Sequence, residues 1–399
     1  MTGPSRNSPI EPAASALLCL FVFSIPWEKS IQAPGVGTLS HLFGILAFAV
    51  GAIVAVRRGS IRPPNLAIGL AALWVLWSAL TYLWSLDRQA TLMRAITLAE
   101  LLAMVWLIWD ACRTPLRQTR LMQSYVWGAV AASASTFLRY FQGRQTYYRR
   151  YTAPGFDPND FGLILALSIP LALYLALRAR GWERWWYRAA VLAVISAVLL
   201  TASRTALIAT FAAFGFAIWT WREADRWQRI SSALLTALLL LGMLQFAPAP
   251  SRSRLATISN ELTRGTLHNR TVIWKAGLKV LKSHPVVGVG AAAYPEAVRP
   301  WLGTPGVPGH QYVAHNTFLS VLVEGGIVGF GLYALLLGTL ALFVWNMRAT
   351  ERALWSVVAA VWVVGVSTLT WEHYKPGWLF MALMMTEWAR SYWPAERQE

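Results

Sequence analysis

Apolar residues run in long windows along this chain, and charged residues are confined to the stretches between them. Eight charge-free windows approach or exceed the roughly 20 residues that a helix needs to cross a bilayer. They cover residues 31–56, 66–86, 121–138, 161–177, 205–221, 230–251, 325–347 and 353–371. Less uniform windows lie near 13–27, 91–109, 189–203 and 376–393. The pattern therefore predicts about twelve transmembrane helices.

Composition supports a membrane location, since 56% of the 399 residues are hydrophobic and only 13% are charged. A water-soluble domain has too little interior to bury that much apolar surface. We predict an all-α integral membrane protein, a polytopic bundle with one long external loop that contains short amphipathic helices. The expected parts are about nine N-terminal helices over 1–245, the loop over 246–314, and about three C-terminal helices with a short tail over 315–399.

The basic residues set the expected orientation. With the N-terminus inside, the inner connections carry the larger share of the arginines, so both termini are predicted to be cytoplasmic. No convincing cleavage site follows the first apolar window, so the first helix is expected to be retained. The formal charge of +17 is scattered over loops on both sides, which argues against nucleic-acid binding. The two cysteines, Cys19 and Cys112, suggest neither a disulfide nor a metal site.

The external loop carries more positive charge than topology requires. Within it, apolar residues alternate with lysines after Arg270, and His284 and Pro285 follow as a stop, which predicts a short amphipathic helix on the membrane surface. Its lysines suit anionic lipid headgroups. Arg270 stands at the helix start, where a bidentate guanidinium beside free amides can hold a phosphate.

Arg204 has almost no loop around it, because it lies in a short turn between two apolar windows at the outer boundary. An arginine that snorkels to the interface is one interpretation. The hydroxyl residues Thr201, Ser203 and Thr205 favour the other, a hydrated pocket that this arginine enters.

His315 and Asn316 lie where the external loop re-enters the membrane, at the level expected for Arg204. A histidine there can accept a proton near neutral pH. Glu324 follows nine residues later, so in an unbroken helix it faces away from His315 and lies roughly 13 Å deeper. Gly325 and Gly326 could kink the helix or allow close packing, and either would let Glu324 pair with another buried polar group. An intramembrane carboxylate is a functional candidate, with a structural locking role as the alternative.

Five stretches together resemble a known family. HNTFLSVLVEGGIVG (315–329) is similar to the signature of the O-antigen ligase and polymerase superfamily. NRTVIWKAGLKVLKSHPVVGVG (269–290) resembles the family's upstream arginine, tryptophan, proline and glycine pattern, and SRTAL (203–207) its short arginine turn. LWSLDRQATL (83–92) and GFDPNDFG (155–162) resemble weaker family stretches, so the resemblance spans most of the chain in the expected order.

The resemblance implies a multi-pass glycosyltransferase of the bacterial inner membrane, with a periplasmic active site and the loop over 246–314 on the periplasmic side. Its donor would be a glycan on undecaprenyl pyrophosphate, and in the ligase branch its acceptor would be the lipid A core, which completes lipopolysaccharide. Membrane lipids would surround it. By the same resemblance, Arg204 and Arg270 would hold the pyrophosphate and His315 would activate the acceptor hydroxyl. The family implies inversion at the sugar carbon and neither metal nor cofactor.

Five further residues are candidates for substrate binding. Asn316 and Glu324 belong to the signature and are candidates for substrate binding. Arg139, Arg149 and Arg150 are candidates for contacts with core phosphates, with solvated loop charge as the alternative. Asp157 and Asp160 could begin a metal site, but Asn159 or Asp160 is better interpreted as a helix N-cap.

Three other functions stay open at this stage. An O-antigen polymerase and a protein O-oligosaccharyltransferase would both need the same lipid pyrophosphate site and base. A membrane transporter would place its substrate site near the midplane, often between inverted repeats. No repeat is visible, and the polar candidates lie at the outer rim, which favours an enzyme.

Overall fold

A computed structural model describes residues 10–33, 37–146, 149–220, 270–302 and 312–392. Within these ranges the chain is helical apart from a two-stranded antiparallel hairpin, β1 (Gln32–Ala33) with β2 (Gly37–Thr38). The helices are α1 (Ile10–Ser24), η1 (Ile25–Ser30), α2 (Leu39–Arg58), α3 (Leu66–Leu80), η2 (Thr81–Leu83), α4 (Arg88–Ala111), α5 (Pro115–Phe141), α6 (Pro158–Ala166), α7 (Ser168–Arg178), α8 (Glu183–Leu200), α9 (Arg204–Ala213), α10 (Gly215–Thr220), α14 (Arg270–Ser283), α15 (Tyr294–Val298), η4 (Arg299–Trp301), α16 (Thr317–Trp345), α17 (Ala349–Val366) and α18 (Lys375–Tyr392).

Six described helical segments are long and apolar enough to cross a membrane. They are α2, α3 with η2, α4, α6 with α7, α16 and α17. The prediction of an all-α, multi-pass membrane protein is confirmed. Every predicted window except 230–251 overlaps a helix, and that window lies outside the described residues. The total of about twelve spans stays a prediction.

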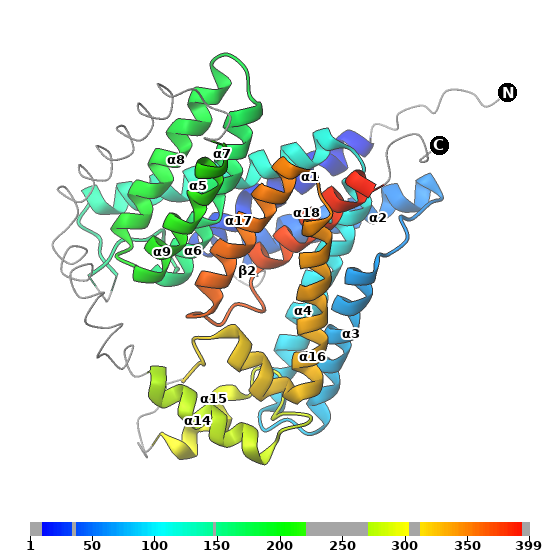
Figure 1. The fold of residues 1–399 in the computed structure, drawn as a ribbon, viewed down its shortest axis with the longest axis vertical. Coiled ribbons are helices and arrows are strands. Elements are labelled where there is room, and N and C mark those ends of the chain that lie inside the picture. Colours follow the sequence, from blue (N-terminus) through cyan, green and yellow to red (C-terminus); the bar gives the residue numbers. More distant parts are fainter. Residues whose placement is uncertain (1–9, 34–36, 147–148, 221–269, 303–311, 393–399) are drawn as a thin grey trace.

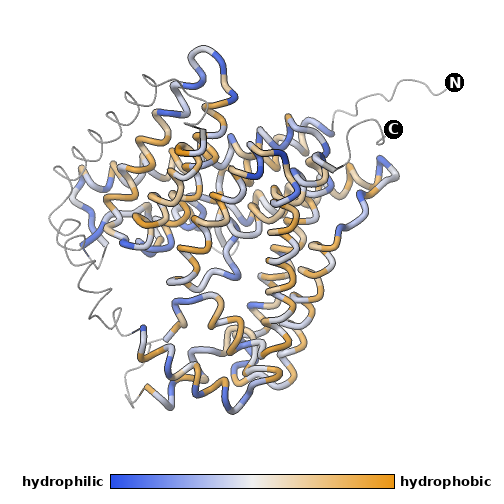
Figure 2. Tube along the Cα trace, viewed as in Figure 1, coloured by the Kyte–Doolittle hydropathy of each residue, from blue (hydrophilic) through white to orange (hydrophobic). Residues whose placement is uncertain are grey.

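The helices pack into one continuous core, in which α6 is deeply buried. Nearly every α6 residue is buried, and Phe161 and Leu163 are fully enclosed. Around this core, α3 packs against both α4 and α16, α1 packs against α2 and α5, and α17 packs against α9 (Figure 1). Apolar residues dominate along these helices (Figure 2), as expected for segments that meet lipid on one side and protein on the other.

A second, smaller core lies under α14 and α15, at the end of the molecule where α16 begins (Figure 1). Ile273, Val280 and Tyr294 are buried here together with Val323 of α16. The lysines of α14 are exposed, so the helix predicted after Arg270 is present and has one buried face. Its location on an external membrane surface stays a prediction.

Helix α16 is broken at Gly326, whose backbone has φ 65 and ψ −169 inside an otherwise helical segment. The break frees backbone groups on both sides, and residues 285–290 satisfy them. Val289 and Gly290 donate to the carbonyls of Val323 and Glu324 at 3.1 and 3.0 Å. In the other direction, the amides of residues 327 and 328 donate to the carbonyls of residues 285 and 286 at 2.9 and 3.3 Å. We call residues 285–290 the inserted loop.

Two glycines make this insertion possible. Gly326 and Gly288 both have positive φ, at 65° and 71°. A Cβ on Gly326 would lie 2.2 Å from the carbonyl oxygen of Val286, and one on Gly288 would lie 2.3 Å from that of Glu324. Both positions therefore need glycine for conformation and for space. The glycine pair was expected either to kink the helix or to allow close packing, and the structure has both.

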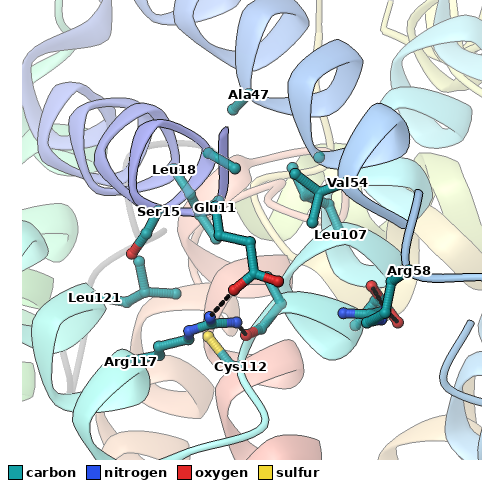
Figure 3. Close-up of a pocket in the computed structure, with 14 residues that line it drawn as sticks. Glu11, Ser15, Leu18, Ala47, Val54, Arg58, Leu107, Cys112, Arg117 and Leu121 are labelled. Carbon is teal, nitrogen blue, oxygen red and sulfur yellow. Dashed lines mark hydrogen bonds and ion pairs between the residues drawn. The ribbon is translucent and has the colours of Figure 1, made fainter. Parts of the chain in front are cut away.

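Ion pairs gather at the helix ends that were predicted to face the cytoplasm. Arg58 and Arg113 both pair with the buried Asp110, at 2.6 and 2.8 Å. Arg117 pairs with Glu11 across a small pocket of about 40 Å³ that also contains Cys112 (Figure 3). That volume is enough for a few waters rather than a substrate. Both cysteines are free, as expected.

Candidate functional site

His315 is held by a contact within the second core. Trp274 of α14 donates from Nε1 to the carbonyl of Ala314 at 2.7 Å, and Ala314 is fully buried. His315 itself is in the left-handed region at φ 46. The next residue, Asn316, is the N-cap of α16 and accepts from the amide of Leu319 at 3.0 Å. The histidine is therefore fixed at the start of α16 and beside the helix that begins with Arg270.

Arg270, His315 and Asp157 lie within electrostatic range of one another. Burial lowers the pKa of His315, the charge of Arg270 lowers it further, and Asp157 acts in the opposite direction. Burial likewise lowers the pKa of Arg270, and Asp157 again opposes this change. A lowered pKa leaves the imidazole neutral near pH 7, in the form that accepts a proton.

Asp157 belongs to this group because it begins α6. Its Oδ1 accepts from the amides of Asn159 and Asp160, at 2.8 and 3.4 Å. The prediction that Asn159 or Asp160 is the N-cap was therefore wrong. Pro158 takes the first helical position, which suits its fixed φ, and moves the cap to the residue before it.

Asp160 points instead toward the segment between α17 and α18. It accepts from Trp371 Nε1 at 2.9 Å and from the Tyr374 hydroxyl at 2.7 Å. In the part of the chain that the structure describes, no three His, Cys, Asp or Glu side chains are grouped as a metal site would need.

Arg204 begins α9, and the turn before it packs against α6. Ser203 caps α9 by accepting from the amide of Ala206 at 3.3 Å. A Cβ on Gly162 of α6 would lie 2.5 Å from Ala206 Cβ and 3.2 Å from Thr201 Oγ1. The same short helix, α6, thus contacts the Arg204 turn and carries Asp157 close to Arg270 and His315.

The hydroxyls predicted to line a pocket beside Arg204 make internal hydrogen bonds. Thr201 Oγ1 donates to the carbonyl of Val198 at 2.6 Å, and Thr205 Oγ1 lies 2.8 Å from Thr368 Oγ1. They shape the tight turn, in which Ala202 is left-handed at φ 50.

The three arginines proposed for core phosphates differ in position. Arg150 is buried and donates to Asn159 Oδ1 at 3.2 Å, so it contacts the first turn of α6. Arg149 is exposed, with φ 56, and Arg139 is half-buried in the last turn of α5. Of these three arginines, Arg150 is therefore the one placed against α6, at Asn159, two residues from Asp157.

Glu324 is buried, and the protein itself uses both of its carboxylate oxygens. Oε2 accepts from the amide of Ala292 at 2.8 Å, and Oε1 accepts from Ser320 Oγ at 3.2 Å. Ala292 follows the inserted loop and has φ 61. Glu324 therefore fastens that part of the chain to α16, consistent with the locking role considered from the sequence.

Left-handed backbone concentrates around these residues. The non-glycine residues with positive φ in the described ranges are Arg149, Ala202, Ala292 and His315. Arg149 and His315 are themselves predicted site residues. Ala292 donates to Glu324, and Ala202 lies two residues before Arg204. Such conformations cost free energy and persist where surrounding contacts enforce them, which is characteristic of functional sites.

Sequence reasoning missed the segment that joins α17 to α18, which we call the α17–α18 loop (residues 367–374). Thr317 Oγ1 donates to the carbonyl of Leu369 and accepts from the amide of Trp371, at 2.9 and 2.8 Å. The loop also contacts the Arg204 turn through Thr368 and α6 through Trp371 and Tyr374. Its signal was the polar run WEHYK between two apolar windows.

Comparison with known proteins gives two kinds of match. A family model described as O-Antigen ligase matches residues 189–334, a stretch that includes Arg204, Arg270, His315 and Glu324. The O-antigen ligase of Pseudomonas aeruginosa strain PAO1 is 26% identical over 438 aligned positions, which cover 100% of this chain and 98% of that protein. The exopolysaccharide production protein ExoQ of Rhizobium meliloti strain 1021 is 37% identical over 83 residues, 18% of each chain. These matches confirm the resemblance drawn from the sequence motifs.

Proposed function

We propose that this chain, which belongs to the O-antigen ligase family of membrane glycosyltransferases, transfers a glycan from undecaprenyl pyrophosphate to the lipid A core. The observation that carries the proposal is the grouping of Arg270, His315 and Asp157 around the start of α6, with the Arg204 turn packed on the same helix. This group combines cations for a pyrophosphate with a neutral base for a hydroxyl.

The arginines act on the donor. Pyrophosphate leaves with negative charge that grows as the bond to the sugar breaks, and guanidinium groups stabilise that charge through paired hydrogen bonds. Burial of Arg270 strengthens this interaction because less water screens it. Arg204 is proposed to hold the same pyrophosphate from the turn before α9.

His315 acts on the acceptor. Its neutral imidazole takes the proton of a core hydroxyl while the hydroxyl oxygen forms a bond to the anomeric carbon. The bond from that carbon to the pyrophosphate oxygen breaks, and undecaprenyl pyrophosphate leaves with the electron pair. A single displacement of this kind inverts the sugar carbon. No metal takes part in the proposed step, because the arginines supply the positive charge at the leaving group.

The test is reconstitution of purified protein in lipid vesicles with a glycan on undecaprenyl pyrophosphate, with and without lipid A core, and with excess chelator in a parallel set. We expect glycan on the core only when core is present, and equal transfer with chelator. Longer lipid-linked chains without core would show a polymerase, and transfer only to an added protein would show a protein O-oligosaccharyltransferase. Glycan that crosses the vesicle membrane without transfer would show a transporter.

Variants test the assigned roles in the same assay. Arg204→Ala and Arg270→Ala should each lower transfer by about 10²-fold or more, the scale of a lost charge-stabilising donor. Arg270→Lys, which keeps the charge and loses the planar fork, should retain intermediate activity. His315→Ala should lose about 10²-fold or more, the usual contribution of a general base. Full activity in any alanine variant would remove that residue from the proposed mechanism.

A further inference from the structure

A groove of about 500 Å³ lies beside the site already described, between α1, α2, α4 and the α17–α18 loop. Its volume is within the range of about 300–1,000 Å³ that small-molecule sites occupy. One part of its wall is apolar and consists of side chains from three helices, among them Phe21, Ile45, Phe48, Leu101 and Met104. Ile45 and Phe48 are exposed, so this wall is open on the side of α2.

The other end of the groove is polar and carries both signs of charge. Glu28 pairs with Lys375 at 2.6 Å, and His41 lies 3.7 Å from Glu100. Lys29 lies against the Tyr374 ring at 5.0 Å from its centroid, with Nζ 3.4 Å from the hydroxyl. The lysines and glutamates that line the groove thus balance in charge.

His373 lines the same polar end and has a fixed orientation. Its Nδ1 lies 3.2 Å from Oε1 of Glu372, a buried carboxylate that also pairs with Arg94. Because Nδ1 faces this carboxylate, Nε2 is the ring nitrogen left to meet a ligand. An imidazole held in this way is suited to a hydrogen bond with a hydroxyl group.

The groove adjoins the candidate site through the α17–α18 loop. Tyr374 lines the groove, and its hydroxyl donates to Asp160, three residues from Asp157 on α6. Trp371 of the same loop contacts Thr317, two residues from His315. A ligand seated in the groove therefore has its polar end next to the elements that position the base.

We propose that this groove binds the lipid acceptor, with an aliphatic chain along α2 and α4 and sugar hydroxyls at the polar end beside His373. This inference rests on the proposed function, which requires two lipid-borne glycans. The balanced charge favours hydroxyl groups, which accept and donate hydrogen bonds. A pyrophosphate would need an excess of positive charge, and the proposed site for it contains Arg204 and Arg270. The exposed apolar wall lets a chain enter sideways from the bilayer.

A photo-crosslinking experiment tests the occupant directly. Full-length protein in vesicles is irradiated with a lipid A core carrying a diazirine in one acyl chain, and in a second arm with an undecaprenyl pyrophosphate carrying a diazirine in its isoprenoid chain. We expect the acyl probe to label peptides from α2 and α4 around residues 45–49 and 101–104, and unlabelled lipid A core to compete. Labelling of these peptides by the isoprenoid probe alone, or by neither probe, would overturn the assignment.

A groove-filling variant tests the consequence for catalysis. Ala49 is exposed and lines the groove, so Ala49→Trp fills it without disturbing the core. The matched control is Leu46→Trp, at an exposed position on the same helix that does not line the groove. We expect Ala49→Trp to raise the KM for lipid A core at least about tenfold, through lost burial of the chain, and to leave the donor KM unchanged. An unchanged acceptor KM, or equal effects of both variants, would contradict the proposal.

The two proposals fail in different ways. If the acyl probe labels the groove while no glycan reaches lipid A core, the proposed ligase activity is wrong and the lipid site stands. If transfer is normal in Ala49→Trp and labelling maps elsewhere, the activity stands and the groove assignment is wrong.

Discussion

At His315 the chain combines an unfavourable backbone conformation with an environment that keeps the imidazole neutral. The left-handed φ of 46 is enforced by the Trp274 contact on one side and the Asn316 cap on the other. Burial and Arg270 together lower the pKa of the ring, and Asp157 opposes them. Proton affinity and position at this residue are therefore set by three separate segments, α6, α14 and the start of α16.

The opposing charge gives a pH prediction. If neutral His315 is the base, kcat/KM falls as the pH drops through its pKa, which lies below the usual value of about 6.5. Asp157→Asn removes the charge that raises this pKa, and asparagine still caps α6. The pKa should fall, and the acid limb of the kcat/KM profile should move to lower pH. Glu296→Gln, at an exposed pair with Arg299, is the control and should leave the limb in place. A limb that moves to higher pH in Asp157→Asn would contradict the sign.

At the scale of elements, α16 contributes residues to both cores, and the chain inserted at its break holds them together. The inserted loop fills the gap at Gly326, and Glu324 holds the chain just after that loop at the amide of Ala292. Leu86 also donates to the carbonyl of Val289 at 3.1 Å, and Thr91 Oγ1 to that of Ala291 at 2.7 Å, so the chain before α4 and the first turn of α4 contact the same segment. The position of α14, and hence of Arg270, depends on these contacts.

A pair of glycine variants on one helix tests this dependence. Gly326→Ala forces a side chain into a backbone conformation of positive φ and extended ψ that is essentially confined to glycine, which costs about 1–3 kcal/mol, and into contact with the Val286 carbonyl. We expect transfer to fall at least about tenfold, equivalent to about 1.4 kcal/mol, because the inserted loop is displaced. Gly331→Ala is the control, since its Cβ would meet nothing within 4 Å. Activity should be unchanged in it, and equal losses in both variants would mean that the break has no special role.

Two variants of Glu324 distinguish the role of its hydrogen bonds from the role of its charge. Glu324→Gln keeps an oxygen for the Ala292 amide and a polar group for Ser320, and we expect activity within about threefold of the parent protein. Glu324→Ala leaves the Ala292 amide without its acceptor, which costs about 1–3 kcal/mol, and transfer should fall about tenfold. Thermal unfolding in detergent should give the same order, with the glutamine variant close to the parent protein and the alanine variant less stable. A glutamine variant as inactive as the alanine variant would instead assign the charge itself a role in the reaction.

At the scale of the whole molecule, local pattern predicted the elements well and their mutual contacts poorly. The apolar windows located the described helices because helix length and burial in lipid leave few alternatives. The charge-free window at 325–347 begins eight residues after α16 does, because a charge-free window excludes Glu324. Inside the protein the Glu324 carboxylate accepts hydrogen bonds from two donors, the Ala292 amide and the Ser320 hydroxyl, so the helix can include this buried charged residue.

The sequence predicted individual residues of the candidate site, but it did not predict the contacts that hold them in place. The motifs identified Arg270 and His315, and the structure brings them together. The contacts of the α17–α18 loop join residues more than 200 positions apart, such as Trp371 and Asp160, and no local spacing encodes such a pair. The cap at Asp157 was missed for a simpler reason, the effect of Pro158 on where α6 begins.

Orientation in the membrane is a prediction for the whole chain. In a background with Cys19→Ser and Cys112→Ser, Lys279→Cys on α14 should react with a membrane-impermeant maleimide in cells whose outer membrane alone is permeabilised. Arg180→Cys, between α7 and α8, should react only after the inner membrane is opened as well. Both positions are exposed, so access to the side chain does not limit either reaction. The reverse labelling would invert the proposed topology.

The inserted loop also imposes an order on biosynthesis. Residues 285–290 leave the ribosome before residues 323–328, which supply their hydrogen-bond partners. Until α16 has been made, the helix that begins with Arg270 can pack against α15 but lacks its contact with Val323, and Trp274 lacks the carbonyl of Ala314 that it binds. A nascent chain that ends before residue 323 already contains Arg204 and Arg270, but it lacks the contacts that fix α14. If the two arginines hold the donor pyrophosphate as proposed, that site therefore forms only late in synthesis, after α16 is in place.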